Sequence, residues 1–447
     1  MDFCKMRTLP ESFLNNLKSV LPDSEFPAFK AALNSKVPTS IRLHPKKGVG
    51  GKIDKPVPWC SNGVYLEERP SFTLDPLFHA GAYYVQEAGS MFLSFVAKQL
   101  KLDEPGKMLL DLCAAPGGKS TLLQSIIHQE SVLIANEVIQ SRNIILRENL
   151  SKWGADNLIV TQNDPADFSK LPPLFDALII DAPCSGEGLF RKTPEAIDEW
   201  SNEHVSLCSK RQQRIIRDSL PCLKNNGYLI YSTCTYNKYE NDNNIAQLLN
   251  DFPLQLVELE VPKDWGIHRT SYGYQFFPHQ TKSEGFYLAI LQLTDESRQP
   301  KPFANKKRKN REKASPLPDY IKLPTGLKSQ TFEDKTLLIT DSTDSLLPEL
   351  QKHLWIKQAG ITAGSWLKHK FIPHHHLAMA YSVDLDVPYY EVTRDQALNY
   401  LRKADIGAVP FVGWGLIRYK QTNLGWIKGL GKRSNNYYPK EWRIRKV

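Results

Sequence analysis

Two cysteines are the residues of this sequence whose placement most clearly favours chemistry. Cys184 closes the apolar run in FDALIIDAPCSGEG (175–188), and Cys234 closes the one in GYLIYSTCTY (227–236). Both runs predict β-strands, and parallel strands that end side by side place the residues after them in one crevice. Packing explains a single cysteine better than it explains two at neighbouring strand ends. We therefore expect one thiol to act as a nucleophile and the other to assist it.

Methyl transfer to C5 of cytosine in a nucleic acid is a reaction that uses such a pair. C5 is too weakly nucleophilic to take a methyl group unaided, but a thiolate that adds to C6 makes the ring react like an enamine. The reaction also needs a base, and an acidic group near N3 that offsets the charge developing on the ring. Asp181, Cys184 and Cys234 supply candidates. The chemistry alone leaves the roles of the two thiols open.

A glycine-rich segment predicts the site of a cofactor. LLDLCAAPGGKS (109–120) reads as a strand, a turn of small residues and the start of a helix that Ser120 would cap. Small residues let the backbone approach a ligand closely at the helix N-terminus. The segment matches neither GxGxxG nor GxxxxGK[ST]. It therefore indicates a nucleotide-like ligand without identifying it.

Acidic residues at the ends of three predicted strands narrow the kind of ligand. Glu137 stands 26 residues after Asp111, where a carboxylate can accept hydrogen bonds from both ribose hydroxyls. Asp164 follows the next strand, where its oxygen could meet an adenine amino group, and Asp181 closes the strand before Cys184. Three acids in register with one edge of a sheet favour a nucleoside-containing cofactor.

The elements that must position these residues alternate along the chain. Strands are predicted at 108–113, 132–137, 157–162, 177–182 and 228–233, with a further strand at 285–293. Helical stretches lie between them, at 120–127, 140–154 and 204–223. This rhythm is typical of an α/β fold with a doubly wound, mainly parallel sheet.

The chain divides into four predicted parts. Residues 1–75 form a small α+β N-terminal domain, with helical spacing at 9–21 and a strand at 37–45. Residues 76–295 form the catalytic domain. Residues 296–319 are a linker rich in Lys, Arg and Pro, and residues 320–447 a second compact α+β unit.

The positive charge is concentrated in the last third of the chain. Residues 301–447 hold 26 Lys and Arg against 13 Asp and Glu, although the whole chain is only +9. Such asymmetry indicates a polyanion-binding part attached to a near-neutral enzyme body. We interpret KKRKNREK (306–313) as a flexible basic linker rather than a nuclear localisation signal.

The cysteine count and the lack of long apolar runs predict a cytoplasmic protein. Seven cysteines include no CxxC pair, and the odd count argues against a disulfide framework. We expect no membrane span, because no apolar run approaches about 18 residues, and we see no signal peptide. We expect no metal, since His374–His376 cannot all face one ion, and we assign that run to a surface turn or helix start. Five cysteines are interpreted as packing residues: Cys4, Cys60, Cys113, Cys208 and Cys222.

The motifs together resemble a known family. LDLCAAPGGKS, DAPCSGEG and YSTCT closely resemble the Sun-type RNA cytosine-5 methyltransferases, in particular the bacterial 16S ribosomal RNA members with a C-terminal PUA-like domain. The resemblance extends over nearly the whole chain. It includes PTSIR (38–42), GAYYVQEAGSM (81–91), FFPHQTKSEGFYLAIL (276–291) and LGWIKGLGKRSNNYYPKEWR (424–443). Two local departures are the sequence Asn237–Asn241 after TCT, which keeps only its last two family residues, and Gln275, where many members have Arg.

The resemblance implies roles for the site residues. It implies a Rossmann-like core and S-adenosylmethionine as methyl donor, with Cys234 as the nucleophile, Cys184 assisting release of the product and Asp181 at N3 of a base flipped out of its helix. Because DNA enzymes lack the TCT cysteine, the presence of both thiols favours RNA. Lys119 is expected either to neutralise a carboxylate or to contact RNA. The implied cofactor residues are Cys113, Ala114, Ala115, Pro116, Gly117, Gly118, Lys119, Glu137, Asp164 and Asp181.

The C-terminal end is the predicted RNA-binding part. Residues 401–447 carry 11 Lys and Arg against 2 acids, interleaved with aromatic residues. We expect Trp414 and Trp426 to belong to a β-barrel core, and we expect RNA contacts from Lys428, Lys432, Arg433 and Lys440. The expected partner is ribosomal RNA, free or within the small subunit, and the protein is expected to be a monomer. Transfer RNA as substrate, or a non-catalytic ribosome-assembly factor, are the alternatives.

Overall fold

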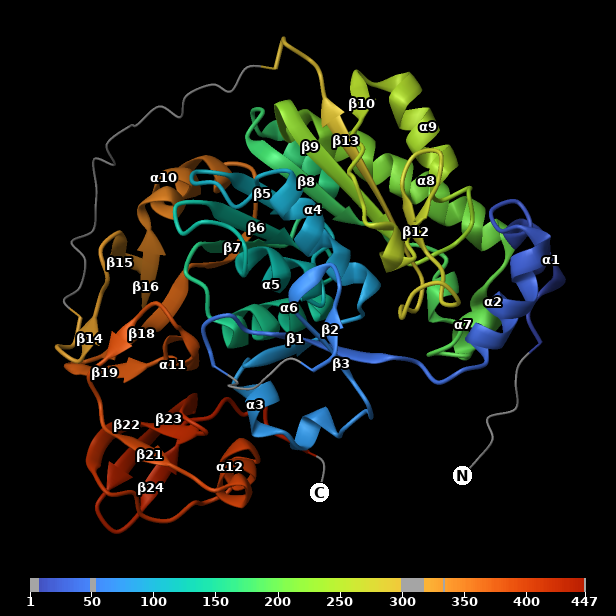
Figure 1. The fold of residues 1–447 in the computed structure, drawn as a ribbon. Coiled ribbons are helices and arrows are strands. Elements are labelled where there is room, and N and C mark those ends of the chain that lie inside the picture. Colours follow the sequence, from blue (N-terminus) through green and yellow to red (C-terminus); the bar gives the residue numbers. More distant parts are fainter. Residues whose placement is uncertain (1–7, 49–53, 299–316, 333, 446–447) are drawn as a thin grey trace.

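The computed structural model describes residues 8–48, 54–298, 317–332 and 334–445 (Figure 1). At its centre lies a ten-stranded sheet whose middle strands are parallel. In spatial order these strands are β9 (Leu223–Thr233), β8 (Phe175–Asp181), β5 (Met108–Asp111), β6 (Val132–Asn136) and β7 (Leu158–Thr161). All five correspond to predicted strands. The expected doubly wound, mainly parallel sheet is therefore confirmed.

Antiparallel strands extend both edges of this sheet. Beyond β9 lie β13 (Phe286–Leu293), β12 (Tyr274–Phe276) and β11 (His268–Arg269), and β10 (Leu254–Leu256) also pairs with β13. Beyond β7 lies β17 (Ile356–Ala359). β13 is the further strand predicted at 285–293, whereas β17 comes from the predicted C-terminal unit.

Helices cover both faces of the sheet. Successive side chains of each strand point to opposite faces, so neighbouring residues join different buried clusters. Leu109 belongs to the same buried cluster as Leu150, whereas the next residue, Leu110, belongs to the cluster that holds Ile216. The first face is covered by α4 (Leu93–Gln99), α5 (Gly118–Gln124) and α6 (Gln140–Trp153). The second face is covered by α8 (Asn202–Ser219), α9 (Asp242–Asp251) and α10 (Asp341–Leu350).

The N-terminal part combines two helices with a small antiparallel sheet. The helices are α1 (Glu11–Leu17) and α2 (Phe26–Leu33), and they lie beside α7 (Glu195–Glu199) and α8 (Figure 1). Phe13 and Phe29 share a buried cluster with Tyr236, so this part covers the chain just after Cys234. The sheet order is β2 (Pro56–Val57), β3 (Cys60–Leu66), β1 (Thr39–Leu43) and β4 (Tyr83–Val85). The last of these strands lies beyond the predicted boundary at residue 75, and α3 (Pro76–His79) precedes it.

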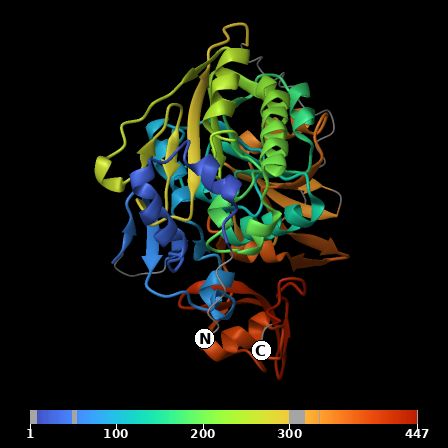
Figure 2. The ribbon, with the colours of Figure 1, turned by 90° about the vertical axis from the view of Figure 1, so that its right-hand side faces the viewer.

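The C-terminal part has two further four-stranded sheets. The first has the order β15 (Leu327–Phe332), β16 (Lys335–Thr340), β18 (Ile361–Leu367) and β19 (Lys370–Pro373). The second has the order β21 (Tyr389–Glu391), β22 (Val412–Tyr419), β23 (Thr422–Leu430) and β24 (Ser434–Asn436). Figure 2 shows this second sheet and α12 (Arg394–Leu401) gathered at the foot of the molecule. The remaining elements are β14 (Ile321–Lys322), α11 (His375–Met379) and β20 (Asp384–Leu385).

The predicted unit 320–447 is not separate from the catalytic core. β17 hydrogen-bonds to the edge of the central sheet, and α10 contributes Leu346 and Leu350 to the core of its second face. The four domain bounds stay a prediction, but the chain between about 341 and 359 is structurally part of the catalytic body. Residues 299–316, which include KKRKNREK, lie outside the described residues, as does Cys4. No helix in the described part of the chain combines the length and apolar character that crossing a membrane requires.

Candidate active site

The two cysteines meet at the carboxyl ends of β8 and β9. These strands are parallel neighbours with Asp181 opposite Ser232, so the chain that follows each of them emerges at the same edge of the sheet. The Sγ atoms of Cys184 and Cys234 lie 3.1 Å apart, and the Cys234 amide approaches Cys184 Sγ at 3.4 Å. Both residues are half-buried. The structure therefore brings the predicted thiol pair together.

The surroundings of Cys184 favour its protonated form. Its hydrogen bond to Cys234 raises the pKa of Cys184 well above the ordinary thiol value, and burial and the nearby Glu240 raise it further. A thiol that keeps its proton can donate it in a hydrogen bond to the neighbouring sulfur. The raised pKa thus favours Cys184 as the donor in its hydrogen bond with Cys234.

A buried carboxylate ties the two cysteine loops together. Glu187, three residues after Cys184, accepts hydrogen bonds from the backbone amides of Tyr236 and Asn237 at 2.8 and 2.9 Å. It also accepts from the Thr235 hydroxyl at 2.5 Å and from the Asn237 side chain at 2.9 Å. The loop that carries Cys234 is therefore fixed by a residue of the Cys184 loop. The sequence interpretation missed this residue, although the motif DAPCSGEG contains it.

Glu240 makes a second link in the opposite direction. It follows Cys234 along the chain and accepts from the Ser185 amide at 3.0 Å and from Gln212 of α8 at 2.7 Å. Burial raises the pKa of Glu240. The two carboxylates hold the cysteine loops from both sides, and Glu240 was likewise not among the predicted site residues.

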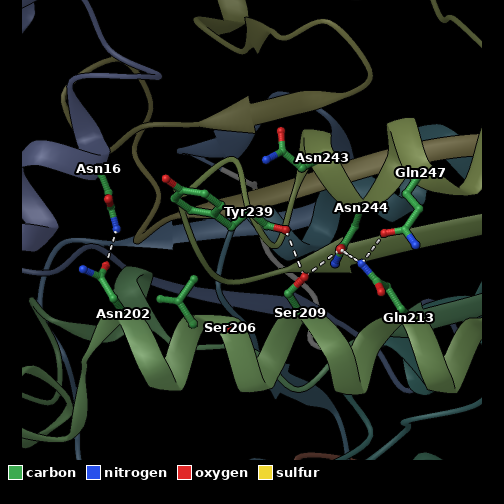
Figure 3. A pocket seen from close by; sticks show the side chains of 10 residues that line it. Asn16, Asn202, Ser206, Ser209, Gln213, Tyr239, Asn243, Asn244 and Gln247 are labelled. Atoms are coloured by element: carbon green, nitrogen blue, oxygen red, sulfur yellow. Dashed lines mark hydrogen bonds between the residues drawn. The ribbon is translucent and has the colours of Figure 1, made fainter.

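An amide-rich hollow of about 380 Å³ lies behind this loop, between α1, α8 and α9 (Figure 3). Ser209 of α8 donates to the carbonyl oxygen of Tyr239 and to Asn244 of α9, and Gln213 donates to the same Asn244 side chain. Asn244 in turn donates to the carbonyl oxygen of Glu240 at 3.1 Å. This network anchors the Cys234 loop to both helices.

The predicted cofactor loop joins β5 to α5. Gly117 caps the helix with φ +113°, a conformation that glycine adopts without strain, and a Cβ there would meet Leu146 at 3.4 Å. Ser120 does not cap α5, contrary to expectation. The helix begins two residues before it, and its hydroxyl donates to Asp111 Oδ2 at 2.6 Å.

Asp111 is a buried carboxyl group with one oxygen unsatisfied. Among the described residues, Oδ1 has no hydrogen-bond partner, and burial raises the pKa of Asp111 to about 7, partly opposed by the bond from Ser120. Burial also raises the pKa of Cys113, which lies half-buried beside the loop and packs against the core as expected. An unpaired carboxyl oxygen beneath a glycine turn is suited to a polar or cationic ligand group.

Lys119 and Asp181 form an ion pair between the cofactor loop and the cysteines. Lys119 Nζ lies 2.7 Å from Asp181 Oδ2, and the Ser232 hydroxyl donates to Asp181 Oδ1 at 2.9 Å. Of the two roles expected for Lys119, the structure shows the neutralisation of a carboxylate. Asp181 thus lies between the predicted cofactor loop and the strand that leads to Cys234.

The other two acids are placed as expected at strand ends, but each has protein partners. Glu137 is buried after β6, accepts from the Ile139 amide at 2.9 Å and lies 3.4 Å from Arg142. Asp164 caps the short helix Pro165–Lys170 and pairs with Arg214 at 3.2 Å. Contact of either acid with a ligand stays a prediction.

Comparison with known proteins places this site in a family. Models of the 16S rRNA methyltransferase RsmB/F, of the RsmF N-terminal domain and of the RsmF PUA domain match residues 97–292, 9–88 and 388–444. Ribosomal RNA small subunit methyltransferase F of Shewanella loihica is 30% identical over 478 residues, covering 98% of this chain and 96% of that protein. The chain belongs to the RsmB/F family of RNA methyltransferases. The protein of the same name from Psychromonas ingrahamii is also 30% identical and covers 97% of both chains.

Solved structures agree with the fold of this RsmB/F family member. A methyltransferase homolog protein from Pyrococcus horikoshii is 26% identical with a TM-score of 0.53, covering 64% of this chain and 100% of that one. NSun6 from the same organism, solved with the S-adenosylmethionine analogue sinefungin, is 18% identical with a TM-score of 0.53, covering 64% and 99%. The Rossmann-like core, the PUA domain and S-adenosylmethionine as cofactor, all expected from the sequence, are confirmed.

The N-terminal domain of this RsmB/F protein braces the cofactor loop through a buried arginine. Arg42 of β1 donates to Gln86 at 2.8 Å, to the Thr121 hydroxyl of α5 at 2.6 Å and to Ser125 at 3.0 Å. Its guanidinium lies 4.5 Å from the ring centroid of Trp153, and burial lowers its pKa to about 10. In the sequence, Arg42 belongs to the motif PTSIR, but nothing in that motif predicts its contact with α5, which only the folded structure creates.

The PUA domain places the residues predicted in its sequence. Trp426 is fully buried, as expected for a core residue, and Trp414 is half-buried, packing against the same core cluster and lining an open groove. Lys428 lies over the Trp414 ring at 5.1 Å. Three further predicted RNA contacts are exposed: Lys432, Arg433 and Lys440.

The histidine run begins a helix, and two of its three members are buried. His374 caps α11 by accepting from the His376 amide, which confirms the predicted helix start. His375 and His376 are buried, and the His375 ring packs edge-on against Tyr438 and Trp442 at 5.2 and 5.0 Å. The surface assignment holds for His374, which is exposed, but was wrong for His375 and His376, because aromatic residues that follow β24 pack against this turn.

Proposed function

We propose that this protein forms 5-methylcytosine in ribosomal RNA of the small subunit, through a covalent bond between Cys234 and C6 of the target base. The thiol pair of Cys184 and Cys234, 3.1 Å apart, is the observation that carries the proposal. The relatives named ribosomal RNA small subunit methyltransferase F support 16S rRNA as the substrate.

The residues of the cofactor loop fit S-adenosylmethionine. Gly117 gives the turn into α5 its left-handed conformation, and the buried Oδ1 of Asp111 has no partner among the described residues. Segment 113–119 with Glu137, Asp164 and Asp181 would hold the cofactor, as the family resemblance implies. When bound, S-adenosylmethionine supplies a methyl group on a positively charged sulfur.

The cysteines would then act in sequence. The Cys234 thiolate attacks C6 and forms the S–C6 bond, and Asp181 in its acid form would donate a hydrogen bond to N3 and so offset the negative charge that develops on the ring. C5 takes the methyl group and then loses its proton to a base. The C5–C6 double bond re-forms as the S–C6 bond breaks, and Cys184 donates a hydrogen bond to the departing sulfur.

Single-cysteine variants test this proposal. The protein is incubated with labelled S-adenosylmethionine and naked 16S rRNA, free small subunits or transfer RNA. Cys234→Ala is expected to abolish labelling, whereas Cys184→Ala is expected to accumulate a denaturant-resistant protein–RNA adduct. Cys60→Ala, which removes a buried thiol of the N-terminal sheet, is the control and should label RNA normally.

The outcomes separate the candidate functions. Full methylation by Cys234→Ala would refute the nucleophile assignment, and labelling at a position other than C5 would refute the product. Labelling of transfer RNA alone would favour that substrate instead. RNA binding without any methylation would favour a non-catalytic assembly factor.

A further inference from the structure

A groove of about 700 Å³ opens between the two C-terminal sheets. One wall is the β18–β19 hairpin, which contributes Trp366, Lys368 and Lys370. The other wall is the β22–β24 sheet, which contributes Trp414 and Lys428. We call it the aromatic–cationic groove. It lies apart from the cysteines and is not accounted for by the catalytic site.

Aromatic rings line both walls of the groove. Trp366 is 37% exposed and contacts the Phe371 ring edge-on at 5.3 Å. On the opposite wall the Trp414 and Tyr437 rings lie 4.4 Å apart, and both residues are half-buried. Ring faces that line an open groove offer stacking surfaces to any nucleic-acid base.

The charged side chains around these rings are all positive. Among the described residues that line the groove, none is acidic, whereas Lys368, Lys370 and Lys428 are cationic. These three lysines have no ion-pair partner in the described part of the chain. By contrast, Lys119 and Arg214 near the cofactor loop are each paired with a carboxylate. Lys428 already lies over the Trp414 ring, and cations without an ion-pair partner beside aromatic rings match the backbone and bases of a single strand.

Lys368 lies at the tip of the β18–β19 hairpin in a left-handed backbone conformation. Leu367 pairs with Lys370, so the loop has only two residues, Lys368 and His369. Lys368 has φ +56°, where glycine or asparagine is the usual residue in such turns. Lys101, Lys403 and Lys420 adopt the same conformation at other turns, so the turn shows only that the Lys368 side chain stands at the tip of the hairpin.

We propose that the aromatic–cationic groove binds unpaired nucleotides of the RNA substrate. Bases stack on Trp366 and Trp414, and phosphates pair with Lys368, Lys370 and Lys428. Stacking and phosphate contacts distinguish a single strand from a duplex but tolerate different bases, so the groove anchors unpaired RNA without reading its sequence. This inference rests on the proposed RNA substrate, yet it concerns a surface that takes no part in methyl transfer.

Binding to short RNAs tests the inference with the full-length protein. Fluorescence anisotropy is measured with a labelled 12-nucleotide unstructured RNA and with the matching blunt duplex, without cofactor. The wild type is expected to prefer the single strand. Trp366→Ala and Trp414→Ala should each weaken single-strand binding about ten-fold, and Trp366→Phe should restore most of it. The double variant Lys368→Ala/Lys370→Ala should lower the slope of log K against log salt by about 1.4.

Two exposed residues outside the groove provide matched controls. Trp355→Ala removes a tryptophan that is 65% exposed on the chain entering β17, and Lys352→Ala removes an exposed cation nearby. Both should bind the oligonucleotide like the wild type. Melting temperatures confirm that each variant is folded, and the Trp366→Phe rescue separates a stacking role from a general structural one.

The results also separate this inference from the proposed function. Groove-dependent binding without methylation by the wild type would support the groove and refute the function. Normal single-strand binding by Trp366→Ala and Trp414→Ala, in an enzyme that still methylates RNA, would overturn the groove alone. If an acidic peptide binds the groove, and RNA binding does not change in the groove variants, the partner would be a protein. That result would also overturn the inference that the groove binds RNA.

Discussion

Cys184 and Cys234 are fifty positions apart in the chain, yet their sulfur atoms lie 3.1 Å apart and share a hydrogen bond. The parallel pairing of β8 with β9 creates this proximity, and the carboxylates of Glu187 and Glu240 fix it. The raised pKa of Cys184 favours this residue as the proton donor of the pair.

Removal of Cys234 should make Cys184 easier to ionise. The hydrogen bond to Cys234 is the largest cause of the raised pKa of Cys184, so Cys234→Ala should lower that pKa, while burial keeps it above the ordinary thiol value. The rate of iodoacetamide alkylation at Cys184, followed by mass spectrometry across pH, measures the change. A profile that shifts to higher pH, or does not move, would contradict the donor role.

Glu187→Gln should slow catalysis without unfolding the protein. An amide nitrogen in place of one carboxylate oxygen would face the donors of Tyr236, Asn237 and Trp200, so the Cys234 loop should move. A displacement of about 1 Å can cost ~100-fold in rate, and we expect a loss of that order in kcat. Glu195→Gln, at an exposed position on α7, is the control and should keep wild-type activity. Equal rates for both variants would show that Glu187 does not position the loop.

Arg42→Met should lower the free energy of unfolding by about 3 kcal/mol, because it leaves buried acceptors on Gln86 and α5 without their donor. It should also weaken S-adenosylmethionine binding, since α5 carries the cofactor loop. Urea unfolding and calorimetric titration measure the two effects. Arg69→Met removes an exposed arginine and should change stability by less than about 0.5 kcal/mol. Similar losses of unfolding free energy in Arg42→Met and Arg69→Met would contradict a stabilising role for the Arg42 hydrogen bonds to α5.

Asp111 should make the cofactor-free protein less stable as pH rises from about 4 to about 7. Its pKa is raised by burial from 3.8 to about 7, so in this window the folded protein holds a proton that the unfolded chain has released. The stabilisation is complete below the unfolded pKa and is lost as pH rises through the folded one. Asp111→Asn cannot titrate, and the difference in unfolding free energy between wild type and variant should therefore fall across this window. A constant difference between pH 4 and 7 would show that Asp111 ionises normally.

The chemistry of the site could be predicted because strand ends are readable in the sequence. Apolar runs place Cys184, Cys234 and Glu137 at strand ends, and a parallel sheet gathers them at one edge. The local start of α5 was less predictable. Ser120 has the residue type of a helix cap, but its hydroxyl bonds to the buried Asp111 instead.

Contacts between distant segments could not be predicted in this way. β17 is a short strand without an alternating apolar pattern, and only its pairing with β7 makes it part of the central sheet. Glu187 looks like an ordinary loop acid until the Cys234 loop folds onto it. Arg42 and Thr121 are 79 positions apart, so no local pattern could join them.

The attachment of β17 to the central sheet fixes the position of the aromatic–cationic groove relative to the cysteines. β18 starts at Ile361, directly after the strand that pairs with β7, and Gly360 between them also bonds to Leu158. The hairpin wall of the aromatic–cationic groove therefore follows directly in the chain from an edge strand of the sheet that carries the cysteines, although the hairpin itself belongs to a separate sheet. An RNA held in the groove and at Cys234 together must span one fixed length, so selection of the target cytosine would depend on its spacing from an unpaired segment.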